Sequence, residues 1–267
     1  MDRGPPSRLE RRLVGLFAKA VFVRGRRRTP PEKPKHPPSQ EVVIEGDVGQ
    51  RLVARWFPVE RPRGVVVLAH PDTRWAKDWF VQRGWIDFIH EAGLEALAFD
   101  FTGYGASEGP ATYPLDDVLA ATRFAQAGSG FLPVHVVGVS YGACAVANAA
   151  PRLSGVKSIV LESPFPNLNI WFRDRLRRLA MDVFDRAFPK TSRFAQADEN
   201  IAHALPERIL FCLAEEDETT PPALTEAVAR RAPQERTTLL RVPGASHLEP
   251  FTTSEEYRQA LLKTWLV

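Results

Sequence analysis

The feature that most restricts the fold is a series of short, uninterrupted apolar runs separated by longer segments with helical periodicity. Such runs are typical of strands that are buried on both faces of a parallel sheet. The runs lie at 65–69, 94–99, 134–139, 158–162, 209–214 and 237–242. Helical patterns follow them, at about 76–92, 115–127, 141–151, 221–231 and 254–265. This alternation predicts an α/β doubly wound sheet. In such a sheet, functional groups collect at the carboxyl ends of the strands.

Two more strands are expected before this series. The segments 41–45 and 51–57 alternate in polarity on either side of a glycine-containing turn, which predicts an antiparallel hairpin. The sequence therefore predicts a mostly parallel sheet of eight strands with helices on both faces. The long connection from Glu162 to Ile209 exceeds a simple crossover. Its apolar helical face at 170–187 predicts a small helical lid at about 165–206, over the carboxyl edge of the sheet.

The first 40 residues differ in composition from the rest of the chain. They hold 11 of the 35 basic residues and three acidic ones, so the rest of the chain carries a net charge of −5. Residues 25–40 are basic and proline-rich, and they predict an extended linker. We expect a tail at 1–40 and one α/β domain at 41–267. Because residues 41–267 carry no excess of positive charge, we do not expect them to bind nucleic acid.

Residues 7–28 of the tail combine a short helical pattern with a dense basic face. Ser7 and Glu10 form a capping-box pattern at its start. A basic amphipathic helix of this kind is typical of peripheral contact with an anionic membrane. Docking of the helix on the acidic body, and disorder, remain open alternatives. No apolar run reaches the length of a membrane-spanning helix.

The two cysteines, Cys144 and Cys212, both lie in apolar stretches. Two thiols make neither a disulfide framework nor a zinc site, and the six histidines lack ligand spacing. We expect buried, reduced thiols in a cytoplasmic protein that needs no metal and no cofactor.

A glycine-flanked serine stands between the run at 134–139 and the next helical pattern. The residues are Gly138, Val139, Ser140, Tyr141 and Gly142, in the pattern G-x-S-x-G. Directly after a strand and before a helix, this pattern predicts a nucleophile elbow, a sharp turn that exposes the serine hydroxyl above the sheet.

A serine hydroxyl needs a base, and the base needs an acid that orients it. His247, just beyond the last strand, is the candidate base, and Asp217, beyond the strand at 209–214, is the candidate acid. The order Ser, Asp, His agrees with this architecture. Glu162, at the end of the run at 158–162, is an alternative acid. The carboxylates next to Asp217 are Glu215, Glu216 and Glu218, which can form a solvated turn.

Four sequence motifs, which follow one another along the chain in the order typical of one family, carry a resemblance to it. They are G-V-S-Y-G at 138–142, FDFTGYGASEG at 99–109, AEEDETTPP at 214–222 and GASH at 244–247, and LESPFPNL at 161–168 agrees with them. Residues 41–267 resemble the α/β-hydrolase superfamily, notably its small-lid serine esterases, lysophospholipases and serine-aminopeptidase-like members. The resemblance implies the α/β-hydrolase fold and a catalytic triad of Ser140, Asp217 and His247.

The chain departs from the family pattern after the third strand. The family usually has His-Gly there, whereas this chain has His70-Pro71-Asp72. Proline has no N–H, so the oxyanion hole is expected to use the backbone amides of Tyr141 and Asp72. The Asp72 carboxylate would oppose an oxyanion unless it points away or is neutralised by Arg74. In the loop that contains Gly103 and Gly105, which we call the glycine loop, Thr102 stands where the family usually has an arginine. This replacement removes a salt bridge that the arginine would form.

The sequence thus predicts a serine hydrolase that cleaves a carboxylic ester or thioester of a small acyl substrate through an acyl-enzyme. Two alternatives remain open. The same triad could cleave an amide or peptide, since the leaving group is selected by the lid and pocket. The body could also be an inactive hydrolase-like scaffold that binds a ligand or partner.

Overall fold

The computed structural model describes residues 37–108, 113–167 and 196–266. Of the tail expected at 1–40, residues 1–36, with the predicted helix and most of the linker, lie outside the described residues, and the first strand already begins at Gln40. So does the expected lid helix at 170–187.

The described chain forms one eight-stranded sheet. In chain order the strands are β1 (Gln40–Glu45), β2 (Arg51–Phe57), β3 (Val65–Ala69), β4 (Glu95–Phe99), β5 (Val134–Val139), β6 (Val156–Glu162), β7 (Arg208–Ala214) and β8 (Thr237–Val242). In space the order is β1-β2-β4-β3-β5-β6-β7-β8. β2 pairs antiparallel with β1 and with β4, and every other pairing is parallel. The predicted fold class is confirmed.

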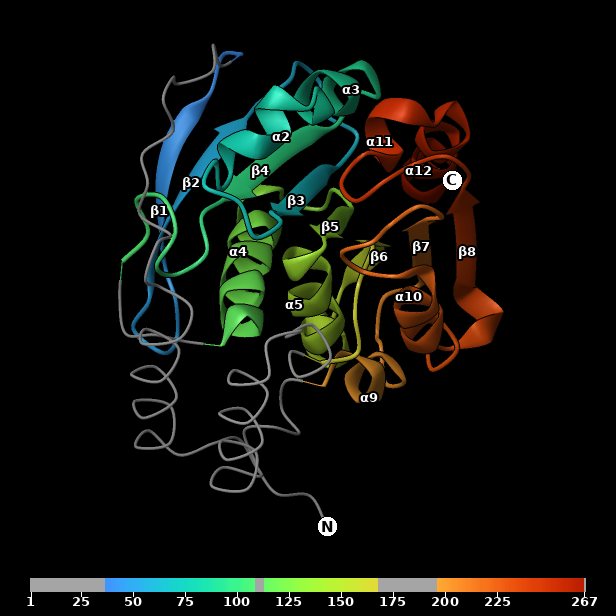
Figure 1. Cartoon of the computed structure of the whole chain (residues 1–267). Coiled ribbons are helices and arrows are strands. Elements are labelled where there is room, and N and C mark those ends of the chain that lie inside the picture. Colours follow the sequence, from blue (N-terminus) through green and yellow to red (C-terminus); the bar gives the residue numbers. More distant parts are fainter. Residues whose placement is uncertain (1–36, 109–112, 168–195, 267) are drawn as a thin grey trace.

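The valine-rich central strands are buried because helices cover both faces of the sheet (Figure 1). One face carries α4 (Pro114–Gly128), α5 (Tyr141–Ala149), α9 (Ala197–Ile201) and α10 (Pro222–Ala229). The other carries α2 (Asp78–Gln82), α3 (Trp85–Glu91), α11 (Pro250–Thr253) and α12 (Glu255–Leu266). Alternate residues of β3 enter the two cores, Val65 and Val67 on the α5 face and Val66 and Leu68 on the α3 face. Two short 3₁₀ turns, Ala150–Arg152 and Gln234–Arg236, complete the connections.

The single helix expected at 76–92 is in fact two helices. Gly84 separates α2 from α3 with a φ of 76°, a left-handed conformation that an α-helix cannot continue through. The apolar periodicity crosses this break unchanged, because Trp79, Phe80, Trp85 and Ile86 all pack into the same core. The spacing of apolar residues in 76–92 therefore could not show that the helix is interrupted at Gly84.

The described ends of the long connection after β6 lie close together. The Ala197 amide donates to the Pro166 carbonyl at 2.7 Å, and Ala197 and Ile201 of α9 belong to the same core as α5. No helix within the described ranges is long and apolar enough to cross a membrane.

Candidate active site

Ser140 lies at the turn between β5 and α5. Its φ of 52° and ψ of −112° are strained angles for a residue with a side chain. Both flanking glycines are required by close backbone approach. A Cβ on Gly142 would lie 2.0 Å from the Ala69 carbonyl oxygen, and one on Gly138 would lie 2.5 Å from the Gly142 carbonyl oxygen. The G-x-S-x-G segment thus has the local geometry of a nucleophile elbow.

The structure brings together the three residues that the sequence singled out as a triad. His247 Nε2 lies 3.0 Å from Ser140 Oγ, and His247 Nδ1 lies 2.7 Å from Asp217 Oδ2. A neutral imidazole with its proton on Nδ1 satisfies both contacts, because it donates to the carboxylate and accepts from the hydroxyl. This is the arrangement in which a histidine can remove the serine proton.

Asp217 is held in place by its own loop. Its Oδ1 accepts the backbone amides of Thr219 at 2.9 Å and Thr220 at 2.7 Å, which leaves Oδ2 for the histidine. The Asp217 side chain is 1% exposed, whereas Glu215, Glu216 and Glu218 lie at the surface. The structure therefore separates the one buried carboxylate of this turn from its solvated neighbours.

Glu162, the alternative acid, is fully buried at the end of β6. The pKa of Glu162 is raised to about 8, mainly by burial and in part by the nearby Asp217 carboxylate, while the Tyr257 hydroxyl opposes the rise. A carboxyl that stays protonated at neutral pH carries no charge to stabilise an imidazolium. Asp217, and not Glu162, makes the contact with His247.

Glu162→Gln is expected to alter the pH dependence of stability. The folded-state pKa of about 8 lies above the ordinary value of 4.5, so the folded protein holds one proton more than the unfolded chain between these values. Stability contributed by the protonated carboxyl is complete below pH 4.5 and is lost as the pH rises toward 8, with a slope of about 1.4 kcal/mol per pH unit. The free energy of unfolding of the variant, relative to wild type, should therefore increase by about 2–3 kcal/mol over two pH units of this window.

Urea denaturation at a series of pH values measures this difference. Glu216→Gln, which removes a surface carboxylate, is the matched control and should give a nearly constant difference from wild type. A constant difference for Glu162→Gln as well would mean that Glu162 is ionised in the folded protein.

The loop after β3 is fixed by a buried histidine. His70 Nε2 accepts the Phe101 amide at 3.2 Å, and burial lowers the pKa of His70 to about 4, so the ring is neutral. The Asp72 carboxylate accepts a hydrogen bond from the Tyr104 hydroxyl at 2.8 Å. The Arg74 guanidinium, one of the two ways considered for offsetting this charge, lies over the ring of Trp75 at 5.6 Å. The tyrosine, which sequence reasoning missed, is thus a partner of this carboxylate.

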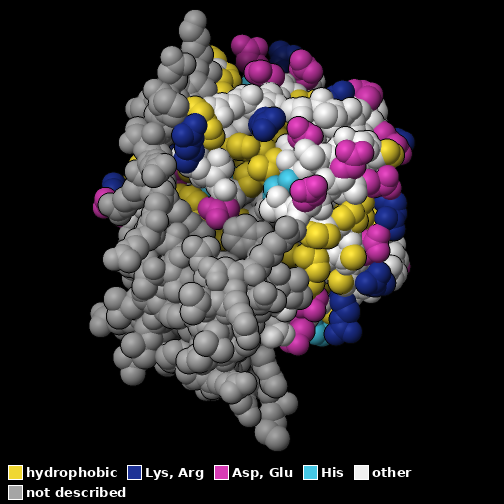
Figure 2. Space-filling model, viewed as in Figure 1, with side chains coloured by type: hydrophobic (Ala, Val, Ile, Leu, Met, Phe, Trp, Pro, Cys, Tyr) yellow, Lys and Arg dark blue, Asp and Glu magenta, His cyan; other side chains and the backbone are white. Residues whose placement is uncertain are grey.

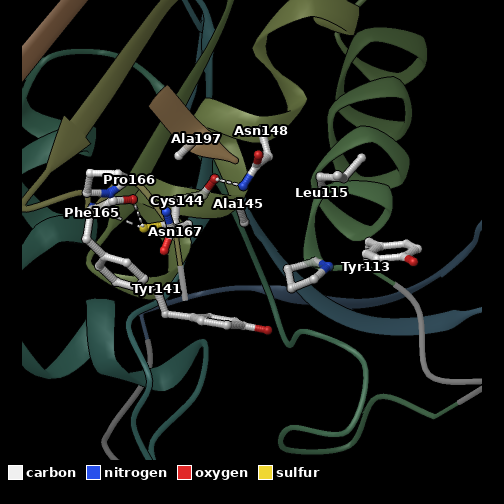
Figure 3. Close-up of a pocket in the computed structure, with 11 residues that line it drawn as sticks. Tyr113, Leu115, Tyr141, Cys144, Ala145, Asn148, Phe165, Pro166, Asn167 and Ala197 are labelled. Atoms are coloured by element: carbon white, nitrogen blue, oxygen red, sulfur yellow. Dashed lines mark hydrogen bonds between the residues drawn. The ribbon is translucent and has the colours of Figure 1, made fainter. Parts of the chain in front are cut away.

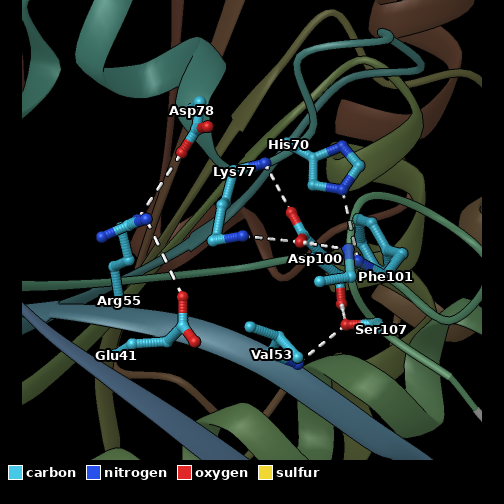
Figure 4. Close-up of polar contacts among 10 residues, drawn as sticks. Glu41, Val53, Arg55, His70, Lys77, Asp78, Asp100, Phe101 and Ser107 are labelled. Carbon is cyan, nitrogen blue, oxygen red and sulfur yellow. Dashed lines mark hydrogen bonds and ion pairs between the residues drawn. The ribbon is translucent and has the colours of Figure 1, made fainter. Parts of the chain in front are cut away.

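An ion pair that sequence reasoning also missed holds the glycine loop beneath the site (Figure 4). Asp100 Oδ2 lies 2.6 Å from Lys77 Nζ, and the Lys77 and Ala106 amides both donate to the same carboxylate. A Cβ on Gly105 would lie 2.1 Å from this carboxylate, so the loop closes around it. Thr102, in place of the family's arginine, bonds to Asp117 through its amide and hydroxyl. Lys77 comes from another loop. The only sign in the sequence that it could form a buried ion pair is that a lysine stands among apolar residues.

A small cavity of about 40 Å³ lies beside the elbow (Figure 3). Tyr141, Cys144 and Ala145 of α5 form one wall. Cys144 is buried, as expected from the sequence, and so is Cys212.

On the surface seen in Figure 2, hydrophobic side chains gather in a hollow of the described part, with acidic and basic side chains around it. The described residues contain no cluster of His, Cys, Asp and Glu that could hold a metal ion.

Comparison with known proteins supports the fold. A family model described as "alpha/beta hydrolase fold" matches residues 71–197, a range that contains the elbow but neither Asp217 nor His247. The chain is 28% identical over 226 residues to "Uncharacterized protein Rv2307c" of Mycobacterium tuberculosis (strain ATCC 25618 / H37Rv), covering 80% of this chain and 74% of that protein.

Solved structures with low sequence identity share the architecture. The Pyrococcus furiosus esterase Pf2001 superposes with a TM-score of 0.69 at 17% identity, over 88% of this chain and 97% of that chain. Est1E from Butyrivibrio proteoclasticus, with ferulic acid bound, gives a TM-score of 0.65 at 15% identity, over 84% of this chain and 99% of that chain. XC6422 from Xanthomonas campestris, described as an a/b serine hydrolase without lid, gives 0.60 at 18% identity, over 86% and 95%.

Proposed function

We propose that this chain, which has the α/β-hydrolase fold, is a serine hydrolase that cleaves a carboxylic ester or thioester of an acyl substrate. The observation that carries the proposal is the hydrogen-bonded series Ser140–His247–Asp217 at a strained strand–helix turn. Three residues from distant parts of the chain have no structural need to meet in this orientation. Their contacts are those required to activate a serine.

The proposed reaction proceeds through an acyl-enzyme. Ser140 Oγ attacks the substrate carbonyl carbon while its proton passes to His247 Nε2. Asp217 stabilises the resulting imidazolium through Nδ1. The tetrahedral intermediate then expels the alcohol or thiol, which takes the proton from Nε2. Water attacks the acyl-enzyme by the same route, and His247 returns the proton to Ser140 as the acid leaves.

The oxyanion formed in each step would be stabilised by the backbone amides of Tyr141 and Asp72. Tyr141 is the first residue of α5, where the helix dipole favours negative charge. The hydrogen bond from Tyr104 to the Asp72 carboxylate supports this role, because it fixes the side chain and disperses its charge. The His70 contact to Phe101 fixes the same loop from below.

The ester is favoured over the amide because two of the similar structures, from Pyrococcus furiosus and Butyrivibrio proteoclasticus, are described as an esterase and as a protein with ferulic acid bound. Hydrolysis of p-nitrophenyl butyrate against the matching p-nitroanilide compares the two bonds directly. Faster cleavage of the anilide would identify an amidase instead.

Labelling with a fluorophosphonate probe tests the proposed function. We expect covalent labelling of the wild-type protein and none of Ser140→Ala. Ser163→Ala is the matched control, since Ser163 is also a buried serine with positive φ at the end of the neighbouring strand, and it should label like wild type. A folded wild-type protein that is neither labelled nor active on esters would be an inactive scaffold.

A further inference from the structure

We call the small cavity beside Tyr141 the α5 cavity. The proposed chemistry of the triad gives this cavity no role. We propose that it binds the acyl part of the substrate and selects short, apolar acyl groups of about the length of butyryl. This inference rests on the proposed function, because it assigns the substrate class of the same site.

The α5 cavity begins at the residue that follows the nucleophile. Tyr141, Cys144, Ala145 and Asn148 line it, and their spacing places them on one face of α5. Leu115 of α4, Phe165 after β6 and Ala197 of α9 form the other walls. The ring of Tyr141 packs against Phe101 and Tyr104 at 5.2 and 5.9 Å between centroids, which holds it at the edge of the cavity.

The polar side-chain atoms of Cys144 and Asn148 in this lining are already engaged. The Cys144 thiol donates to the Phe165 carbonyl and accepts the Phe165 amide. Asn148 donates to the Cys144 carbonyl, and its oxygen accepts from Asn200. Burial raises the pKa of Cys144, so the thiol stays neutral. These groups leave mainly hydrocarbon surface for a ligand, which suits an alkyl chain rather than a charged or sugar-like group.

The position of His247 determines which half of the substrate can enter. The leaving group must lie beside His247, because Nε2 gives it a proton. His247 belongs to the loop between β8 and α11, and α11 and α12 cover one face of the sheet. The cavity lies on the opposite face, between α4 and α5. A carbonyl carbon at Ser140 therefore directs its leaving group toward the loop and its acyl group toward the cavity.

The cavity volume sets the chain length. One water needs about 10–15 Å³ of space, and the cavity has about 40 Å³. It therefore suits a short alkyl chain, such as the propyl tail of a butyryl group. Among p-nitrophenyl acetate, butyrate and hexanoate, wild type should show its highest kcat/KM with butyrate.

Two substitutions change the cavity in opposite directions. Ala145→Val adds two methyl groups to the wall and should lower the butyrate-to-acetate ratio of kcat/KM by about tenfold. Leu115→Ala removes an isopropyl group and should raise the hexanoate-to-butyrate ratio by about tenfold. Leu119→Ala is the matched control: Leu119 is a buried leucine one turn further along α4, outside the cavity lining. It should leave both ratios within about twofold of wild type.

The outcomes separate this inference from the proposed function. If the fluorophosphonate probe does not label folded wild type, the proposed function fails and the inference fails with it. If wild type is labelled and hydrolyses esters but prefers hexanoate, or if Leu115→Ala and Leu119→Ala give the same ratios, the serine hydrolase stands and the acyl cavity is wrong. Should Ala145→Val fail to fold, the comparison between the two leucine variants decides alone.

Discussion

Ser140→Ala and His247→Ala are each expected to lower kcat for ester hydrolysis by about 10⁶-fold, and Asp217→Asn by about 10⁴-fold. The serine and the histidine make and break the reacting bonds, so removal of either abolishes the acyl-enzyme route. The asparagine would favour the imidazole tautomer with its proton on Nε2, which cannot accept from Ser140 at its 3.0 Å contact. KM should change little, because none of the three side chains is assigned to ground-state binding. Steady-state kinetics on p-nitrophenyl butyrate measures both constants.

Two further variants test whether the three residues act as a unit. The double variant Ser140→Ala with His247→Ala should be no slower than either single variant, since one missing member already disables the group. Glu215→Gln, which alters a surface carboxylate beside Asp217, should keep kcat within about twofold of wild type. An active Asp217→Asn together with an inactive Glu162→Gln would show that the acid assignment is wrong.

The sheet could be predicted from the sequence because its central strands obey a local rule. Each residue of β3 and β5 is buried, so β3 is apolar from end to end and β5 is mostly valine, and both stand out against the amphipathic helices. The ends of elements are less visible. The break at Gly84 depends on one backbone angle, and the apolar pattern of 76–92 continues through it.

The candidate triad could be proposed from the sequence because its residues follow strands at the carboxyl edge of the sheet. The contacts that support the loops after β3 and β4 could not, since these contacts join loops that are distant in the sequence. The bond from Tyr104 to Asp72 and the pair of Lys77 with Asp100 depend on how the loop after β3 meets the loop after β4. The α5 cavity depends on four separate segments, among them α4 and α9, whose packing no local pattern encodes.

Asp100→Asn is expected to lower the free energy of unfolding by about 3–5 kcal/mol. The side chains of Lys77 and Asp100 are 9% and 1% exposed, and loss of the carboxylate charge would leave the lysine ammonium buried opposite a neutral amide. Asp47→Asn is the matched control: Asp47 pairs with Arg123 at 2.7 Å, but the side chains are 76% and 50% exposed. Solvent screens such a pair, so the control should cost less than about 1 kcal/mol. Urea denaturation of both variants near neutral pH gives the comparison.

A second variant separates the charge of Asp100 from its role as a backbone acceptor. Replacing the pair by apolar residues, Lys77→Met with Asp100→Leu, removes the stranded charge and should recover part of the loss. Recovery should be incomplete, because the amides of residue 77 and Ala106 would still lack the carboxylate that accepts them. If Asp100→Asn costs no more than Asp47→Asn, the carboxylate does not anchor the glycine loop. If the double variant is as stable as wild type, only the charge matters and the two amides find other acceptors.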